Sequence, residues 1–112
     1  MQTYQNDRNQ SLAVPSKHQL ERFIRAHALD SHRIAFTAHA RKQMRARKVT
    51  DAMVLETLRM GCIHLTPEPD MKFTGLKCRM ERLVSGVRVG AVVYVEHPTP
   101  LLTVVTVIDL GE

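Results

Sequence analysis

The first half of the chain carries the apolar spacing of α-helices in three separate segments. Each segment follows a Ser or Thr, residue types that cap helix N-termini by accepting a hydrogen bond from the first turn. Gln19 lies three residues after the first of these caps and completes a capping-box pattern. We expect the first helix to end near Asp30, and Gly61 to close the third in the left-handed conformation common after helices. The N-cap candidates are Ser16, Thr37 and Thr50.

After Gly61 the period shortens to that of β-strands. Apolar and charged residues alternate from Leu76 to Glu81, which is the pattern of a strand with one buried face. The segment 101–108 is rich in Val and apolar on both faces, which predicts a central or well-covered strand. The predicted strands are 62–65, a segment beginning at Leu76, 87–95 and 101–108, with loops or turns at 66–70, 85–86 and 97–100.

These elements predict an α+β domain. Two or three N-terminal helices would pack on one face of a three- to four-stranded antiparallel sheet and leave the other face partly open. The length of 112 residues and the 44% apolar composition suit one domain with its own core. We assign that domain to 15–112 and expect the segment 1–14, which begins with a polar stretch, to be a flexible N-terminal tail.

Charge is distributed unevenly along the chain. The formal net charge is +5, yet residues 1–61 carry 11 Lys and Arg against five Asp and Glu, whereas residues 62–112 are close to neutral. A basic half favours a polyanionic partner, most simply RNA, and the alternative is a basic surface that only confers solubility. Two cysteines do not make a disulfide framework, and no apolar stretch is long enough to cross a membrane. We therefore expect a soluble cytoplasmic protein.

The basic residues concentrate between Asp30 and Asp51, where no acidic residue occurs. His39 lies at the head of the second predicted helix, and a neutral histidine there is a candidate general base. RNA supplies its own nucleophile, the 2′-hydroxyl, so cleavage needs only a base, an acid and cations. The alternative is that His39 caps or packs and that the basic run is a solvated helix face. The nucleic-acid contacts predicted in this run are Arg41, Arg45, Arg47 and Lys48.

A second cationic group lies on the strand that begins at Leu76. Lys77, Arg79 and the nearby Arg82 are candidates for gripping an RNA backbone, and the alternative is a solvated sheet face. The four residues best able to bind a metal lack the spacing of zinc sites, so we expect neither a metal nor a cofactor. They are Cys62, His64, Cys78 and His97.

The segment 36–50 has the sequence FTAHARKQMRARKVT. It contains a His-Ala pair, a Met five residues after the His, and an Arg and an aliphatic residue before the next capped helix. Together with Gly61 and a closing strand LTVVTV at 102–107, this segment resembles a small bacterial family, domain of unknown function 4258. The resemblance covers roughly 34–109 and implies the fold of RelE-like and barnase-like ribonuclease toxins.

The resemblance also implies roles for individual residues. His39 matches the family's histidine at the helix start, and Lys48 stands where a glycine is more typical. The implied residues of the active face are Arg79, Arg82 and Thr106. A toxin of this type would be held by an acidic antitoxin protein that covers the basic face.

The sequence thus predicts an RNA-binding protein of toxin type, a metal-independent endoribonuclease. His39 would act as base or acid, Arg79 and Arg82 would stabilise the phosphate, and the helix cations would position the backbone. Two alternatives stay open: a non-catalytic nucleic-acid-binding module, and a protein-binding regulator of phage or plasmid type.

Overall fold

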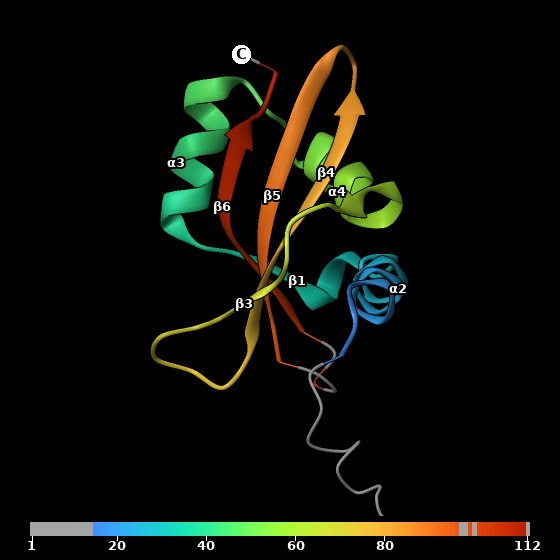
Figure 1. Cartoon of the computed structure of the whole chain (residues 1–112). Coiled ribbons are helices and arrows are strands. Elements are labelled where there is room, and N and C mark those ends of the chain that lie inside the picture. The colour runs from blue at the N-terminus through green and yellow to red at the C-terminus, as the bar shows by residue number, and fades with distance from the viewer. Residues whose placement is uncertain (1–14, 97–98, 100, 112) are drawn as a thin grey trace, which may run out of the picture.

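The computed structural model describes residues 15–96, 99 and 101–111 (Figure 1). The expected N-terminal tail 1–14 and the turn residue His97 lie outside the described residues. In chain order the elements are α2 (Lys17–His27), η1 (Ser31–Arg33), β1 (Ile34–Phe36), α3 (Ala38–Arg47), α4 (Asp51–Met60), β2 (Cys62–Ile63), β3 (Glu68–Pro69), β4 (Leu76–Val84), β5 (Val87–Val95) and β6 (Leu102–Asp109). None of the helices in this part of the chain is long and apolar enough to span a membrane.

The strands form one mixed sheet of six strands in the order β1-β6-β5-β4-β2, with β3 also paired to β4. β1 runs parallel to β6, and the other pairs are antiparallel. The α+β class is therefore confirmed, and β6 lies between β1 and β5, as a covered strand should, but the prediction of a three- to four-stranded antiparallel sheet is wrong. The missed strands, β1 and β3, are three and two residues long, too short to show an alternating pattern. Pro69 lies at the sheet edge, where a missing N–H is tolerated.

All three N-cap predictions are confirmed. Ser16 Oγ accepts a hydrogen bond from the Gln19 N–H at 3.1 Å, and Gln19 Oε1 accepts one from the Ser16 N–H at 2.8 Å. The hydroxyls of Thr37 and Thr50 likewise accept from the backbone N–H three residues onward. These bonds satisfy donors that have no partner inside a helix. α2 ends at His27, about one turn earlier than the sequence predicts.

The left-handed residue lies after α3 rather than after α4. Gly61 has φ −81° and ψ −177°, an extended conformation, so the prediction of a left-handed glycine there is wrong. A Cβ at Gly61 would instead lie 2.4 Å from the Thr57 carbonyl oxygen and 2.7 Å from that of Glu81, so close packing of backbone requires the glycine. Lys48, with φ 57° and ψ 39°, ends α3 in the left-handed region. That conformation explains why glycine would suit the position of Lys48.

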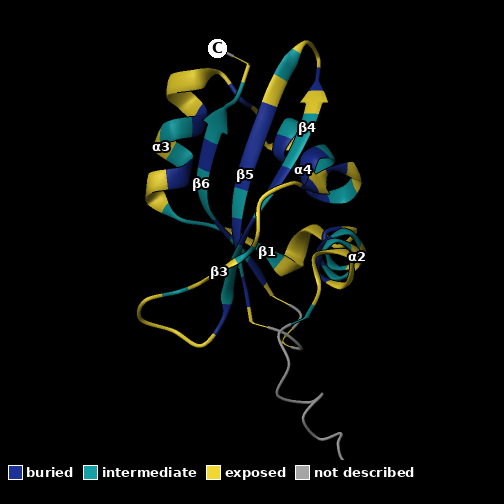
Figure 2. Ribbon diagram, viewed as in Figure 1, coloured by how far each residue is buried: buried dark blue, intermediate teal, exposed yellow. Residues whose placement is uncertain are grey.

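One hydrophobic core joins all three helices to one face of the sheet, and burial is deepest along β5 (Figure 2). α4 lies over β4 and β5 and contacts α2, whereas α3 runs beside β6 (Figure 1). Buried members of this core include Leu20, Ile24, Ala40, Val54, Leu58, Met80 and Val93. Alternate residues of the same strands face away from the helices and are only half-buried, among them Lys77, Arg79, Val92 and Thr106.

β6 carries a bulge that α3 holds in place. Val92 pairs with Thr106, and the next residue of β5 pairs with Val104, so Val105 is one residue too many on β6. The Thr37 hydroxyl donates to the Val105 carbonyl at 3.3 Å, and the Thr37 N–H donates to the Val104 carbonyl at 3.0 Å. The Val107 N–H donates to Gln43 Oε1 at 2.8 Å. α3 therefore supplies partners for backbone groups that β1 is too short to reach.

Candidate functional site

A groove of about 490 Å³, open to solvent, lies on the sheet face opposite the helices. β4, β5 and β6 form its floor, and the connection that leads from β2 through β3 forms a wall and crosses in front of the sheet in Figure 1. Lys77, Arg79 and Thr106 line this groove, so three residues predicted from separate strands come together. The bulge places both Val105 and Thr106 along the groove, where a regular strand would turn one of them to the core.

Arg79 is held in position by a carboxylate on its own strand. Its Nε donates to Glu81 Oε2 at 3.0 Å, and the Glu81 side chain is only 9% exposed. Arg88 Nη2 lies 3.9 Å from the other Glu81 oxygen. Among the described residues, the Nη groups of Arg79 have no partner. The guanidinium is therefore oriented and still has N–H donors for a phosphate.

Two carboxylates share the groove with the two cations. Glu68 is exposed on β3, opposite Lys77 in the β3–β4 pairing. Asp70 accepts hydrogen bonds from the backbone N–H groups of Lys72 at 2.7 Å and Phe73 at 2.9 Å. Those two bonds hold the pKa of the Asp70 carboxyl below its ordinary value of 3.8. Asp70 thus stays ionised and shapes a loop, whereas the Glu68 carboxylate forms no hydrogen bond or ion pair within the described residues.

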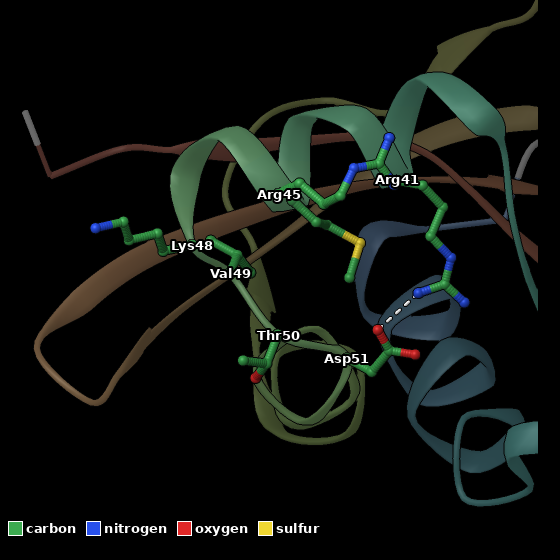
Figure 3. A pocket seen from close by; sticks show the side chains of 7 residues that line it. Arg41, Arg45, Lys48, Val49, Thr50 and Asp51 are labelled. Atoms are coloured by element: carbon green, nitrogen blue, oxygen red, sulfur yellow. Dashed lines mark hydrogen bonds and ion pairs between the residues drawn. The ribbon is translucent and has the colours of Figure 1, made fainter.

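The basic helix lines a different cavity, of about 330 Å³, between α3 and the start of α4 (Figure 3). Arg41, Arg45 and Lys48 contribute to its lining, as their spacing predicts. Arg41 Nη1 donates to Asp51 Oδ1 at 2.6 Å, and its guanidinium lies 4.0 Å from the centre of the Phe36 ring. In Figure 3 the Lys48 side chain extends away from that ion pair.

His39 lines neither the groove nor the cavity. It is exposed in the first turn of α3, and its imidazole has no hydrogen-bond partner among the residues that the structure describes. It precedes Gln43 by one turn, so it projects from the flank of α3 that faces the β6 edge. Arg47 is likewise exposed and outside both cavities.

Arg82 and Arg79 lie on opposite sides of β4. Arg82 is three residues from Arg79, and side chains alternate along a strand, so an odd spacing separates them. Arg82 Nε donates to Glu56 Oε2 at 2.9 Å, and its Nη1 donates to the Met60 carbonyl at 3.4 Å, both on α4. Arg82 therefore joins β4 to α4, and the structure does not bring it to the groove with Arg79.

Sequence reasoning did not identify Thr66, Glu68 and Asp70 as lining residues. These residues lie in a segment whose composition indicates only a loop. The available signal is Pro67 and Pro69, which hold a chain extended, but no local pattern shows which strand such a segment will cross. Pairing of β3 with β4 is what brings the three side chains to the groove.

The two cysteines are in unlike surroundings. Cys78 is fully buried in the core, as its place in the alternating pattern predicts, and burial raises the pKa of its thiol to about 11. Cys62 is exposed on β2, where Arg25 Nη2 lies 3.5 Å from its sulfur. Among the described residues, no group of three or more His, Cys, Asp and Glu side chains is arranged to hold a metal ion.

A known protein family matches the larger part of the chain. The family model described as Domain of unknown function (DUF4258) matches residues 36–109, from the end of β1 to the end of β6. No curated protein and no solved structure was found to match the chain. The matched region contains α3, α4, the bulge of β6 and every groove residue, and it leaves out α2. The chain therefore belongs to the DUF4258 family.

Proposed function

We propose that this protein binds RNA along the sheet groove and cleaves it without a metal, as a toxin-type endoribonuclease of the cytoplasm. The observation that supports the proposal is that Lys77, Arg79 and Thr106 line one groove on the face left open by the helices. Arginine binds phosphate through paired N–H donors, lysine binds it as a point charge, and a hydroxyl donates to a phosphate oxygen. These three side chains suit an RNA backbone that lies across the sheet.

The reaction requires a base, a cation at the phosphate and an acid. The base removes the proton of the 2′-hydroxyl, and the 2′-oxygen attacks phosphorus. The 5′-oxygen leaves with a proton from the acid, which yields a 2′,3′-cyclic phosphate and a 5′-hydroxyl end. In the groove, Glu68 is the proton acceptor, Arg79 neutralises charge on the phosphate, and Lys77 is the proton donor.

His39 is the other candidate for the base, from the sequence. It is exposed and outside the groove, whereas Glu68 lies within the groove beside the two cations. The two versions of the mechanism assign the general base to different side chains, so they predict loss of cleavage in different variants. One assay therefore separates them.

The assay is a time course on total RNA in excess EDTA with four proteins: wild type, Glu68→Gln, His39→Ala and the control Glu56→Gln. The control neutralises a carboxylate on α4, outside the groove, and keeps an amide oxygen that can accept the hydrogen bond from Arg82. We expect wild type to produce 2′,3′-cyclic phosphate ends and Glu68→Gln to cleave about 100-fold more slowly or worse. His39→Ala and Glu56→Gln should retain activity. Loss of activity in His39→Ala alone would assign the base to His39. No cleavage by wild type would refute the catalytic proposal.

A non-catalytic binding module is the second candidate. The observation that favours it is that His39 and Arg82, which the sequence assigns to chemistry together with Arg79, do not line the groove in which Arg79 lies. This candidate predicts RNA binding that weakens steeply with salt and no cleavage product.

An acidic antitoxin protein is the proposed partner in the toxin version, and its carboxylates would meet Arg45 and Lys48, which have no ion-pair partner within the described residues.

A further inference from the structure

The loop between β3 and β4 is exposed yet built to a fixed shape. The Asp70 carboxylate accepts from the Lys72 and Phe73 N–H groups, and the Asp70 N–H donates to the Gly75 carbonyl at 3.1 Å. These bonds close the loop at its base. Residues 71–74 are all exposed, and the loop is drawn in yellow at the edge of the molecule in Figure 2.

β5 holds the other end of the loop. The Tyr94 hydroxyl accepts from the Gly75 N–H at 3.0 Å and donates to Glu96 Oε1 at 3.2 Å. The Thr74 hydroxyl donates to the second Glu96 oxygen at 3.2 Å. A Cβ at Gly75 would lie 2.6 Å from the Tyr94 ring, so only glycine permits this approach. The loop is thereby fixed to the sheet through the side chains of Tyr94 on β5 and of Glu96, the residue that follows β5.

This arrangement presents one aromatic ring to solvent. Phe73 contacts Tyr94 edge-on, with ring centroids 6.0 Å apart and an interplanar angle of 69°, and it remains 65% exposed. A T-shaped contact with one neighbour covers at most one face of the Phe73 ring, so a face is left for another partner. Phe73 is therefore an apolar side chain that is held in one orientation and remains accessible to a ligand.

The aromatic pair lies at one end of the groove. Tyr94 follows the groove residue Val92 by two positions and so faces the same side of the sheet. The cross-strand neighbour of Tyr94 is Lys77, and the Asp70 carboxylate that fixes Phe73 also lines the groove. Lys72, beside Phe73, adds a further cation at this end.

We propose that Phe73 stacks on an unpaired base of an RNA strand whose phosphates lie along Lys77 and Arg79, so that the substrate class is single-stranded RNA. The inference rests on the proposed RNA binding of the groove. Duplex bases are already stacked on one another, so an exposed ring can take a base only from a single strand, a loop or an end. Stacking uses the face that every base has, so the contact is tolerant of sequence.

The neighbouring Met71 provides a matched control. It is 95% exposed on the same loop and is also apolar, but it has no ring. If the loop docks a hydrophobic surface of a protein, removal of either side chain weakens that docking. If the loop stacks a base, only removal of the Phe73 ring weakens binding, and Phe73→Trp preserves it.

The experiment is a fluorescence titration of four proteins, Phe73→Ala, Met71→Ala, Phe73→Trp and wild type, with three probes. The probes are a short single-stranded RNA, its duplex, and an abasic strand of the same length. We expect Phe73→Ala to bind the single strand about 5- to 150-fold more weakly than wild type, which is the range for loss of one stacked base. Binding to the duplex and the abasic strand should not change. Met71→Ala and Phe73→Trp should bind all three probes as wild type does.

Arg79→Ala separates failure of this inference from failure of the proposed function. Suppose that wild type binds the single strand, that Arg79→Ala lowers this affinity, and that Phe73→Ala has the same affinity as Met71→Ala. The groove then binds RNA, and stacking by Phe73 is refuted. If Phe73→Ala lowers the affinity for the abasic strand as much as the affinity for the normal strand, the ring does not contact a base, and the inference is again refuted. If wild type binds none of the probes, both proposals are refuted.

Discussion

The sheet groove and the helix cavity both collect cations, but they are assembled in different ways. Arg41, Arg45 and Lys48 reach their cavity from one helix, at the spacing of successive turns. The groove takes residues from the β2–β3 connection, β4, β5 and β6, and it places carboxylates beside its cations. The helix cavity has three cations and Asp51, which is already paired with Arg41.

The two regions therefore suit different tasks: the helix cavity attracts a polyanion, and the groove positions groups that can act on it. A stripe of exposed cations on a helix attracts a polyanion from any direction and imposes little geometry. A groove with an oriented arginine, a hydroxyl and the Glu68 carboxylate, which has no partner among the described residues, defines positions for a phosphate and for a proton acceptor. We therefore expect the helix cavity to govern salt-dependent affinity and the groove to govern what happens to the bound strand.

The largest predicted effect compares one arginine from each region. Arg79→Ala should slow metal-free RNA cleavage about 100- to 1,000-fold, because it removes the cation that neutralises the phosphate. Arg45→Ala should lower affinity at low salt and reduce the salt dependence of binding by about one phosphate contact, with cleavage of bound RNA unchanged. Single-turnover rates at saturating protein, with affinities at two salt concentrations, test both. Equal loss of single-turnover rate in the two variants would contradict the division.

An intermediate effect concerns the support of the groove by α3. Gln43→Ala should lower the free energy of unfolding by about 1–3 kcal/mol, because the partly buried Val107 N–H loses its acceptor next to the bulge. Lys42→Ala, at the exposed neighbouring position, is the control and should change stability by less than about 0.5 kcal/mol. Urea denaturation of the two variants measures the difference. If the variants unfold at the same urea concentration, Gln43 does not hold the bulge.

The smallest effect tests the end of the helix cavity. Lys48→Gly should raise the free energy of unfolding by about 1 kcal/mol, because glycine accepts the left-handed backbone without the Cβ penalty. Arg47→Gly, one residue earlier and still helical, removes the same charge and should instead destabilise by about 1 kcal/mol. Thermal unfolding of the pair measures the two signs. Destabilisation by Lys48→Gly would show that its side chain contributes more than its backbone conformation costs.

Local patterns identified the helices well because their signals are local. Thr37 and Thr50 cap helices in the structure as their residue type predicts, since the bond joins residues three apart. Local patterns did not predict β1, because its three residues gain their conformation from parallel pairing with β6, which lies far along the chain. Gly61 was recognised as important for the wrong reason, because the backbone that it must approach belongs to α4 and, far along the chain, to β4.

The sequence by itself determined the helices, the long strands and the buried face of β4, all of which depend on spacing within short segments. It also carries the match to the DUF4258 family over residues 36–109. The tertiary structure alone decided which charged residues meet. It brought Lys77, Arg79 and Thr106 into one groove and turned Arg82 to α4. It also added Glu68 and set Phe73 at the groove's end. The physical reason is that strand pairing and the bulge of β6 join residues distant in sequence, and no local period encodes those contacts.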